Sequence, residues 1–594
     1  MKKLIITVLY AVAAILSISC DKALNPLDNG YYTDENMKEY PSLVKGFVDE
    51  AYALATVTTY LHEEYLYLDC ATDNAVATNS TNLLRKMAEG SLTQSADPFA
   101  DYWARDFNGI RYVNKFLKDR KGINTTYIRD IQQDSLLRYN YQGDAFALRA
   151  WFQYDLLSKF AGRGMDGKLY GYPVIDENFD QTTADAASFK RASVDECVAK
   201  IIADCDSALV YLPLANRDWL AENTSVQGAC RWARFDGMSV TALKALTYLL
   251  WASDTFNPEG NVERWKLAAT FAANAMQMKL DQDGKHGFKP LDSFSWTDPN
   301  SPEIYWCSRN SGNTSTMEKS QYPAGFNGSC LYSPTQELVD AFPAANGYPI
   351  SDERSEYDPK NPYANRDPRL YATVFFNGAN VVRAGSDEVM YTFETYEGGK
   401  DMHELTNNGL TGYYLKKFVY LGWNAKDKAA QTMPRAVFYI SWRDMCLALA
   451  EAANRYEGPQ GSEFGISAKK ALSYIRSRST ADGAKGIGAS SDPYLDECAA
   501  DPVKFEELVR NERRIEFCFE GKRFFDLMRW NVPVAQRNVP VHRVNIVKDG
   551  ETMEYSTVEV ATRNLKSQFL PVPFDDIVKA PGLVQNEGWD SWSK

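Results

Sequence analysis

Several short motifs combine residue types that enzymes use, but each lacks a part of the required pattern. Residues 162–167 follow the G-x-G-x-x-G spacing that can hold a dinucleotide, yet they follow a helical pattern where that site needs a strand. His62, Glu63 and Glu64 have no second histidine at the spacing of a zinc protease. The sequence has neither a P-loop nor a G-x-S-x-G nucleophile turn. These patterns therefore do not support nucleotide binding, metalloprotease or serine hydrolase chemistry.

Carboxylates are abundant, and two further kinds of chemistry depend on them. The 78 acidic residues offer many pairs of the type that hydrolyse glycosidic bonds, although no particular pair stands out. Residues 281–284, Asp-Gln-Asp-Gly, are similar to the start of a calcium loop but lack the later ligands. We expect no cofactor and no metal, with calcium at residues 281–284 and a glycoside hydrolase as the alternatives that stay open.

Cys20 is the residue whose position predicts a covalent modification. Lys2 and Lys3 precede an apolar run from Leu4 to Ile18, which is too short to span a bilayer, and Ser19 is the small residue before the cysteine. This order resembles a bacterial lipoprotein signal, in which lipid alkylates the thiol and the cysteine becomes the mature N-terminus. We therefore expect residues 1–19 to be a signal peptide. The alternative is an ordinary secretory signal that is cleaved nearby.

The composition describes a large globular chain with an acidic surface. Hydrophobic residues make up 45% of the 594 residues, and the net charge is −13. A nucleic-acid partner would require a basic footprint, so this class of function is excluded. The sequence contains no C-x-x-C pair, and Cys197, Cys205 and Cys518 fall in helical patterns where a thiol packs as a small core residue.

Apolar residues at helical spacing predict a mostly α fold built from helix pairs. Ser193 and Glu196 form a capping box at the start of a helix that ends before Pro213. Helix pairs of this length resemble tetratricopeptide repeats. The predicted helices span residues 34–58, 134–160, 193–212, 236–253, 262–280, 439–456 and 465–478.

The helical period is lost between residues 281 and 435, where Gly, Pro, Asn, Asp and Ser are frequent. Long irregular stretches inside a compact protein are usually functional. Short β pieces are expected at Leu370–Phe376 and Val389–Phe393. The predicted organisation is thus a signal (1–19), a helical-repeat region (20–290), a loop-rich region (291–435) and a C-terminal region (436–594) that packs back on the repeats.

Four segments carry a resemblance to a known family. They are residues 334–342 (PTQELVDAF), 365–370 (NRDPRL), 512–530 (ERRIEFCFEGKRFFDLMRW), and 570–573 with 585–589 (LPVP and QNEGW). Their order and spacing resemble the SusD/RagB family of outer-membrane nutrient-binding lipoproteins of Bacteroidetes. The resemblance implies a lipid-anchored protein of the cell surface that caps a SusC-like TonB-dependent transporter. It implies binding of oligosaccharides, or of peptides or another nutrient in some branches, and no catalysis.

The third segment also has a structural interpretation of its own. Glu512 and Glu516 lie one turn apart on a predicted helix. Arg513, Arg514, Arg523 and Arg529 are near enough to pair with Glu516, Glu520 and Asp526. We expect a partly buried charge network that holds the fold, in which loss of one partner is costly.

The family resemblance places the ligand site in the loops of the irregular half. Aromatic faces stack on sugar rings or apolar groups, so we predict a ligand role for Trp296, Trp306, Tyr322 and Phe326. Polar contacts to hydroxyls or to a peptide backbone are predicted for Asn79, Asn82 and Arg85. Residues 69–95 contain no Trp, Tyr or Phe, so the aromatic cradle of starch-binding members is at best half present. Trp103 starts a helical pattern and is expected in the core.

Overall fold

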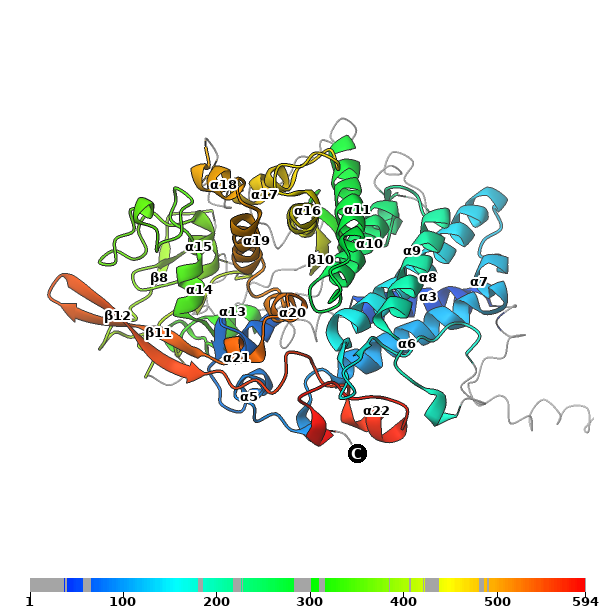
Figure 1. Cartoon of the computed structure of the whole chain (residues 1–594), viewed down its shortest axis with the longest axis horizontal. Helices are drawn as coiled ribbons and strands as arrows, with labels where there is room; N and C mark the ends of the chain where they lie inside the picture. Colours follow the sequence, from blue (N-terminus) through cyan, green and yellow to red (C-terminus); the bar gives the residue numbers. More distant parts are fainter. Residues whose placement is uncertain are drawn as a thin grey trace, which may run out of the picture.

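Helices that follow one another along the chain pack side by side through its first half (Figure 1). Helix α3 (Pro41–Ala55) packs on α6 (Ala100–Leu117), and α6 packs on α8 (Ile131–Phe160). The series continues through α9 (Val194–Tyr211), α10 (Gly237–Ala252), α11 (Val262–Asp281), α16 (Trp442–Glu457) and α17 (Ala468–Arg476). Stacked neighbouring helices are the hallmark of repeat scaffolds, and the predicted mostly α fold with helix pairs is confirmed.

The computed structural model describes most of the chain. The described residues are 37, 40–56, 66–179, 185–216, 226, 228–282, 301–308, 316–383, 385–404, 408–419, 421, 437–479, 485–488 and 491–592. The shorter helices are α5 (Leu83–Ala88), α7 (Lys121–Asn124), α13 (Thr316–Gln321), α14 (Gln336–Ala341), α15 (Pro368–Thr373), α18 (Pro493–Cys498), α19 (Pro502–Glu516), α20 (Arg523–Arg529), α21 (Val534–Arg537) and α22 (Phe574–Lys579).

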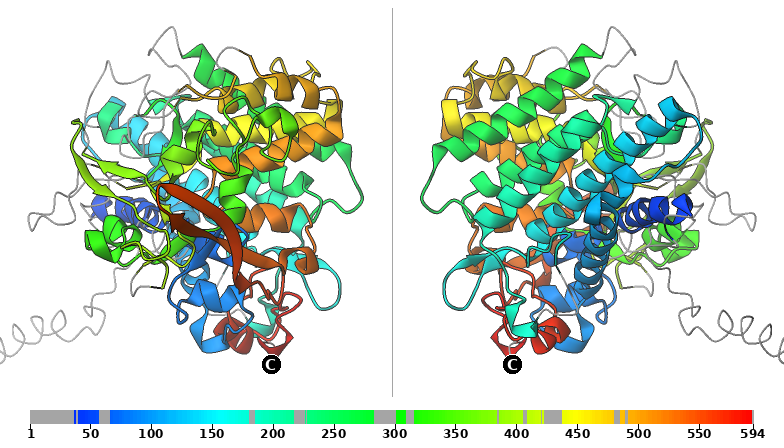
Figure 2. Two further views of the ribbon diagram at one scale, coloured as in Figure 1. Left: turned by 90° about the vertical axis from the view of Figure 1, so that its left-hand side faces the viewer. Right: turned by 90° about the vertical axis from the view of Figure 1, so that its right-hand side faces the viewer.

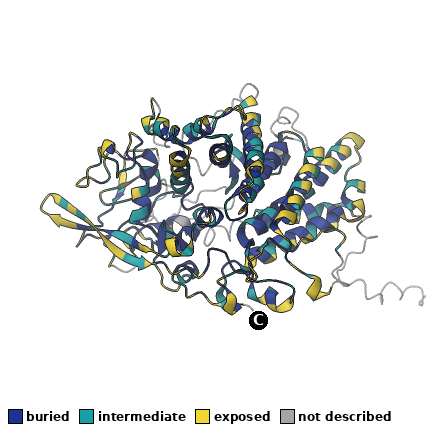
Figure 3. Ribbon diagram, in the orientation of Figure 1, coloured by how far each residue is buried: buried dark blue, intermediate teal, exposed yellow. Residues whose placement is uncertain are grey.

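Capping residues explain where the long helices begin. Ser193 Oγ accepts a hydrogen bond from the Glu196 N–H at 3.2 Å, and the Glu196 carboxylate accepts one from the Ser193 N–H at 2.9 Å, which confirms the predicted capping box. Helix α3 begins at Pro41, since proline suits the first helical turn, and residues 34–36 and 38–39 of the helix predicted from residue 34 lie outside the described residues. Buried residues line the contacts between the helices (Figure 3).

Small two-stranded antiparallel sheets accompany the helices, and several of their strands come from the loop-rich region. The pairs are β1 (Ala75–Ala77) with β5 (Tyr332–Pro334), β2 (Gly162–Arg163) with β3 (Leu169–Tyr170), β4 (Ile304–Cys307) with β10 (Phe438–Ser441), β6 (Val374–Phe375) with β9 (Tyr414–Leu415), and β7 (Asn380–Val382) with β8 (Val389–Thr392). The strand predicted at residues 370–376 is only partly formed. Asp367 caps the helix that starts at Pro368, so residues 368–373 are helical.

A long hairpin near the C-terminus was not predicted. Strands β11 (Pro540–Asp549) and β12 (Thr552–Thr562) pair along their length and lie at the end of the molecule away from α3 to α9 (Figures 1 and 2). The sequence signal is Asp549-Gly550 between two apolar-polar alternating stretches, and Gly550 has a φ of 59°. This signal could have identified the hairpin.

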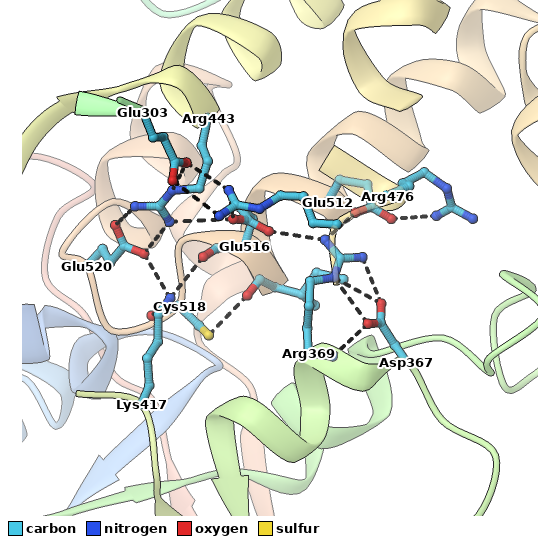
Figure 4. Close-up of polar contacts among 12 residues, drawn as sticks. Glu303, Asp367, Arg369, Lys417, Arg443, Arg476, Glu512, Glu516, Cys518 and Glu520 are labelled. Atoms are coloured by element: carbon cyan, nitrogen blue, oxygen red, sulfur yellow. Dashed lines mark hydrogen bonds and ion pairs between the residues drawn. The ribbon is translucent and has the colours of Figure 1, made fainter. Parts of the chain in front are cut away.

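A buried cluster of opposite charges joins the loop-rich half to the helices (Figure 4). We call it the charge cluster, and its members are Glu303, Asp367, Arg369, Lys417, Arg443, Arg476, Arg478, Glu512, Glu516 and Glu520. Arg369 of α15 reaches two carboxylates on α19, Glu512 at 2.8 Å and Glu516 at 3.3 Å. Arg443 of α16 reaches Glu520 at 2.8 Å. The cluster therefore fixes α15, α16 and α19 relative to one another.

The expected network around residues 512–530 is present, with partly different partners. Arg513 and Arg529 contact Asp526 at 2.9 and 2.8 Å, as predicted. Arg514 and Arg523 instead both reach Asp73, each at 3.0 Å. These ion pairs connect the C-terminal segment to the first loop of the chain.

Candidate functional site

Trp306 lies in the hydrophobic core. Only 1% of its surface is exposed, and its ring lies 4.2 Å from Phe235 and 4.6 Å from Trp151 between ring centroids. Its indole N–H donates to the Ala233 carbonyl at 3.3 Å. Strand β4 carries Trp306 toward the helices, where neighbouring rings cover both faces. The predicted ligand-stacking role of this residue is therefore wrong.

Tyr322 and Phe326 form a second, smaller core in the loop-rich half. Both side chains are fully buried, and their rings lie 4.9 Å apart in an edge-to-face arrangement. Phe326 also packs against Tyr391 at 4.9 Å. Rings with no exposed surface offer no face to a ligand, so the prediction is wrong for these two residues as well. Trp296 lies outside the described residues.

The polar residues predicted for ligand binding have structural roles near strand β1. Asn82 caps α5, since its Oδ1 accepts from the Leu84 N–H at 2.9 Å. Arg85 donates to the carbonyl of Thr78 at 3.1 Å and to Glu89 at 2.8 Å. Asn79 is exposed and accepts from the Thr81 N–H at 2.8 Å. Contact of these three residues with a ligand stays a prediction.

The catalytic and metal motifs of the sequence do not assemble a site in the described chain. Residues 162–167 form the turn between β2 and β3, and not the start of a helix. His62 to Glu64, Asp283 and Gly284 lie outside the described residues. Within the described ranges, no group of three or more His, Cys, Asp or Glu side chains is arranged to hold a metal ion. None of the described helices is long and apolar enough to cross a membrane.

A cavity of about 540 Å³ opens between α3, α8, Val226 and residues 230–234. We call it the α3–α8 cavity. Its size is within the range of pockets that hold small ligands. Its wall combines aromatic rings, cations, a carboxylate and an amide, supplied by Lys45, Asp49, Tyr52, Asn140, Tyr141 and Arg234.

Asp144, a fully buried carboxylate on α8, organises the wall of this cavity. Arg231 donates to both of its oxygens, at 2.6 and 2.9 Å, and the Tyr52 hydroxyl donates at 2.7 Å. Arg234 adds a fourth hydrogen bond at 3.1 Å. A buried carboxylate with this many donors is fully compensated. The wall is therefore held in one arrangement before any ligand arrives.

Arg234 connects this buried anchor to the open part of the cavity. Its guanidinium lies 4.6 Å from the centroid of the Tyr52 ring and 5.9 Å from that of Tyr141. It also reaches Asp49 on α3 at 2.6 Å. Flat cationic and aromatic groups therefore share one surface of the cavity.

The charges at the mouth are fixed by their neighbours. Burial alone would raise the pKa of Asp49, but the hydrogen bond from Lys45 and the charge of Arg234 outweigh it and lower that pKa. Burial raises the pKa of Tyr141 to about 12, so its hydroxyl stays protonated at neutral pH. Hydroxyl donors, a carboxylate acceptor and ring surfaces together suit a ligand with many hydroxyl or amide groups.

Only part of this cavity has a signal in the sequence. Asp144 stands out as a carboxylate within the apolar pattern of α8, and Tyr141 lies one turn before it. Their partners Arg231 and Arg234 are 87 and 90 residues from Asp144 in the chain. Spacing along the sequence therefore could not predict that these groups are in contact.

Two family models match the sequence. The model of the SusD family matches residues 303–589. A second model, described as starch-binding associating with outer membrane, matches residues 27–235. No curated protein matches the chain. The chain belongs to the SusD family, as the resemblance of the four sequence segments predicted.

Solved structures share the fold along nearly the whole chain. A SusD-like protein from Bacteroides fragilis is 22% identical, with a TM-score of 0.69 over 95% of this chain and 99% of that chain. A SusD-like carbohydrate binding protein from the same species is 17% identical, with a TM-score of 0.66 over 92% and 99%. A laminarin-binding SusD-like protein is 17% identical, with a TM-score of 0.54 over 92% and 98%.

Proposed function

We propose that this protein is a cell-surface lipoprotein that binds oligosaccharides and delivers them to a SusC-like TonB-dependent transporter of the outer membrane. Membership of the SusD family is the observation that carries the proposal. The names of the carbohydrate-binding and laminarin-binding neighbours support a glycan as the ligand. The proposed activity is binding without turnover.

The α3–α8 cavity is the proposed place of the oligosaccharide. Sugar rings have apolar faces and a rim of hydroxyls, so they suit a wall that offers both rings and hydrogen-bonding groups. Tyr141 and Arg234 would contact the ring, while Asp49, Lys45 and Asn140 would bond its hydroxyls. The ion pairs to Asp144 keep Arg234 in place, which lowers the ordering cost of binding.

Replacing Tyr141 with alanine tests this site. We expect the affinity for the native glycan to fall at least about tenfold, because a central aromatic contact typically contributes about 2 kcal/mol. Tyr139→Ala is the matched control, since Tyr139 is 54% exposed on the same helix and does not line the cavity. Calorimetric titration after a glycan-array screen gives both affinities. Equal loss in both variants, or no loss in either, would place the site elsewhere.

The same screen separates the other ligand classes. Binding of peptides and of no glycan would make the protein a peptide-binding member of the scaffold. Cleavage of an oligosaccharide by the purified protein would contradict a purely binding function and support a hydrolase.

The transporter partnership has its own test. Stacked helices provide a broad surface of the kind that repeat scaffolds use for partners, and a stable contact needs to bury more than about 1,000 Å². Purification from the native membrane in mild detergent should therefore recover a β-barrel protein of the TonB-dependent class. Recovery of this protein alone under several gentle conditions would contradict the partnership.

A further inference from the structure

A second cavity lies on the outer side of the helical repeats. It has a volume of about 400 Å³ and is formed by α6, residues 175–179, Phe189 and Asp576 of α22. We call it the α6 groove. It shares no lining residue with the α3–α8 cavity. Two separate cavities of ligand size are therefore present on the helical half.

Aromatic rings form the floor of the α6 groove. The Trp103 ring is buried, as predicted, and lies 5.0 Å from Phe107 between centroids. Phe107 and Phe189 are half-buried, and their rings lie 5.9 Å apart. Half-buried rings at the base of a cavity leave apolar surface for a flat apolar face of a ligand.

Three cations stand along one edge of the groove. Arg111, Lys115 and Lys118 are spaced four and three residues apart, which places them on one side of α6. All three are exposed, and none forms an ion pair with another residue of the described chain. Desolvation and the nearby charges of Arg111 and Lys121 lower the pKa of Lys115. An anionic group beside Lys115 would relieve this repulsion.

Two of the three carboxylates that line the groove have other partners. Glu177 pairs with Arg149 at 2.5 Å, and Asp176 accepts from the Asn178 N–H at 2.9 Å. Asp576 lies on the far wall, where burial raises its pKa. The chain as a whole carries a charge of −13, so unpaired cations beside an aromatic floor are a local departure from an acidic surface.

We propose that the α6 groove is a second carbohydrate site, which binds oligosaccharides that contain uronic acids. The sugar rings lie on Phe107 and Phe189, and their carboxylates contact Arg111 and Lys115. Asp176 and Asp576 accept hydrogen bonds from hydroxyls of the sugar. The proposal rests on the proposed function only in taking a glycan as the ligand. Arg111 and Lys115 lie over the rings of Tyr112 and Phe47 but have no anionic partner among the described residues. A neutral sugar would supply none, and an anion without ring faces would not use the aromatic floor.

Calorimetric titration of the full-length protein with acidic tetrasaccharides tests the groove. The probes are the tetramers of galacturonate, glucuronate and mannuronate, each with its methyl-esterified, uncharged form. We expect at least one acidic tetramer to bind and its ester to bind at least about tenfold more weakly, since charge-assisted hydrogen bonds are lost. Raising the salt from about 0.05 to about 0.3 M should also weaken binding of the acid.

Variants then assign the binding to the groove. Arg111→Gln/Lys115→Gln should weaken binding of the acidic tetramer at least about tenfold. The control Lys360→Gln/Lys485→Gln removes the same charge from exposed positions outside the groove and should change the affinity less than about twofold. Failure of all three acidic tetramers to bind, or unchanged binding by the groove variant, would overturn the proposal.

The two sites can be told apart. Tyr141→Ala should leave uronate binding intact, and the groove variant should leave binding of a neutral glycan in the α3–α8 cavity intact. If the protein binds the acidic tetramer but no neutral glycan, the proposed site in the α3–α8 cavity is contradicted and the α6 groove is not. Loss of uronate binding in Tyr141→Ala but not in the groove variant would assign the acid to the α3–α8 cavity and overturn the second site.

Discussion

Replacing Glu516 with glutamine is expected to reduce the free energy of unfolding by about 3 to 5 kcal/mol. The carboxylate of Glu516 is buried and lies 3.3 Å from Arg369, 3.5 Å from Arg443 and 3.2 Å from Arg478. Glutamine keeps the shape of the side chain and removes the charge, so three guanidinium groups lose a counter-ion away from water. Urea unfolding, followed by far-UV circular dichroism, measures the loss.

A surface ion pair provides the matched control. Asp496 contacts Lys469 at 2.8 Å, but its side chain is 67% exposed. Asp496→Asn removes the same kind of charge and should cost less than about 1 kcal/mol, because water already screens the pair. Similar unfolding midpoints for Glu516→Gln and the wild type would contradict the role given to the charge cluster.

Acid should weaken the same cluster. Burial alone would raise the pKa of Glu520, but the charges of Arg443 and Lys417 outweigh it and lower that pKa to about 2. A carboxylate whose pKa is lower in the folded state than in the unfolded state stabilises the fold above its unfolded pKa of about 4.3. This contribution is lost as the pH falls from about 4.3 through about 2. Glu520→Gln should therefore unfold more readily than the wild type at neutral pH and show a smaller further loss below about pH 4.

Local patterns were sufficient to predict the helical half of the fold. The predicted helix at residues 236–253 is α10 (Gly237–Ala252), and the one at 262–280 is α11 (Val262–Asp281). The two helices pack on each other, and the apolar spacing that predicts each of them lies within the helix itself, so each signal depends on residues close in sequence. The ends follow from caps such as Ser193 and Asp236, which are also local.

The charge cluster and the loop aromatics depend on contacts that spacing cannot reveal. Glu516 meets residues that are 147, 73 and 38 positions away in the chain. The expected buried network around Glu512 and Glu516 is present, but local spacing does not identify their partners Arg369 and Arg443. In the sequence Trp306 stands next to a Gly-, Asn- and Ser-rich stretch at residues 308–315, whereas its neighbours in space are Phe235 and Trp151. Composition of a loop therefore does not show which side of a ring is covered.

Replacing Cys20 with alanine should move the protein from the membrane fraction to the soluble fraction. The basic start, the apolar run to Ile18 and Ser19 make Cys20 the expected site of lipid attachment, although it lies outside the described residues. A single acyl chain holds a protein only weakly and reversibly, so durable anchoring requires several chains on the modified cysteine. Loss of the thiol removes all of them at once, and the expected change is therefore nearly complete.

Fractionation of cells that carry each variant, followed by immunoblotting, measures the release. Cys230→Ala is the matched control, because Cys230 is an exposed cysteine far along the chain from the signal, and this variant should stay with the membrane. Mass spectrometry of the wild type should show lipid on the peptide Cys20-Asp21-Lys22 that trypsin releases. A Cys20→Ala protein that remains membrane-bound, together with an unmodified wild-type peptide, would show that another feature holds the protein at the membrane. Release of the Cys20→Ala variant but not of the Cys230→Ala variant would place the lipid on the first residue of the mature chain, ahead of α3.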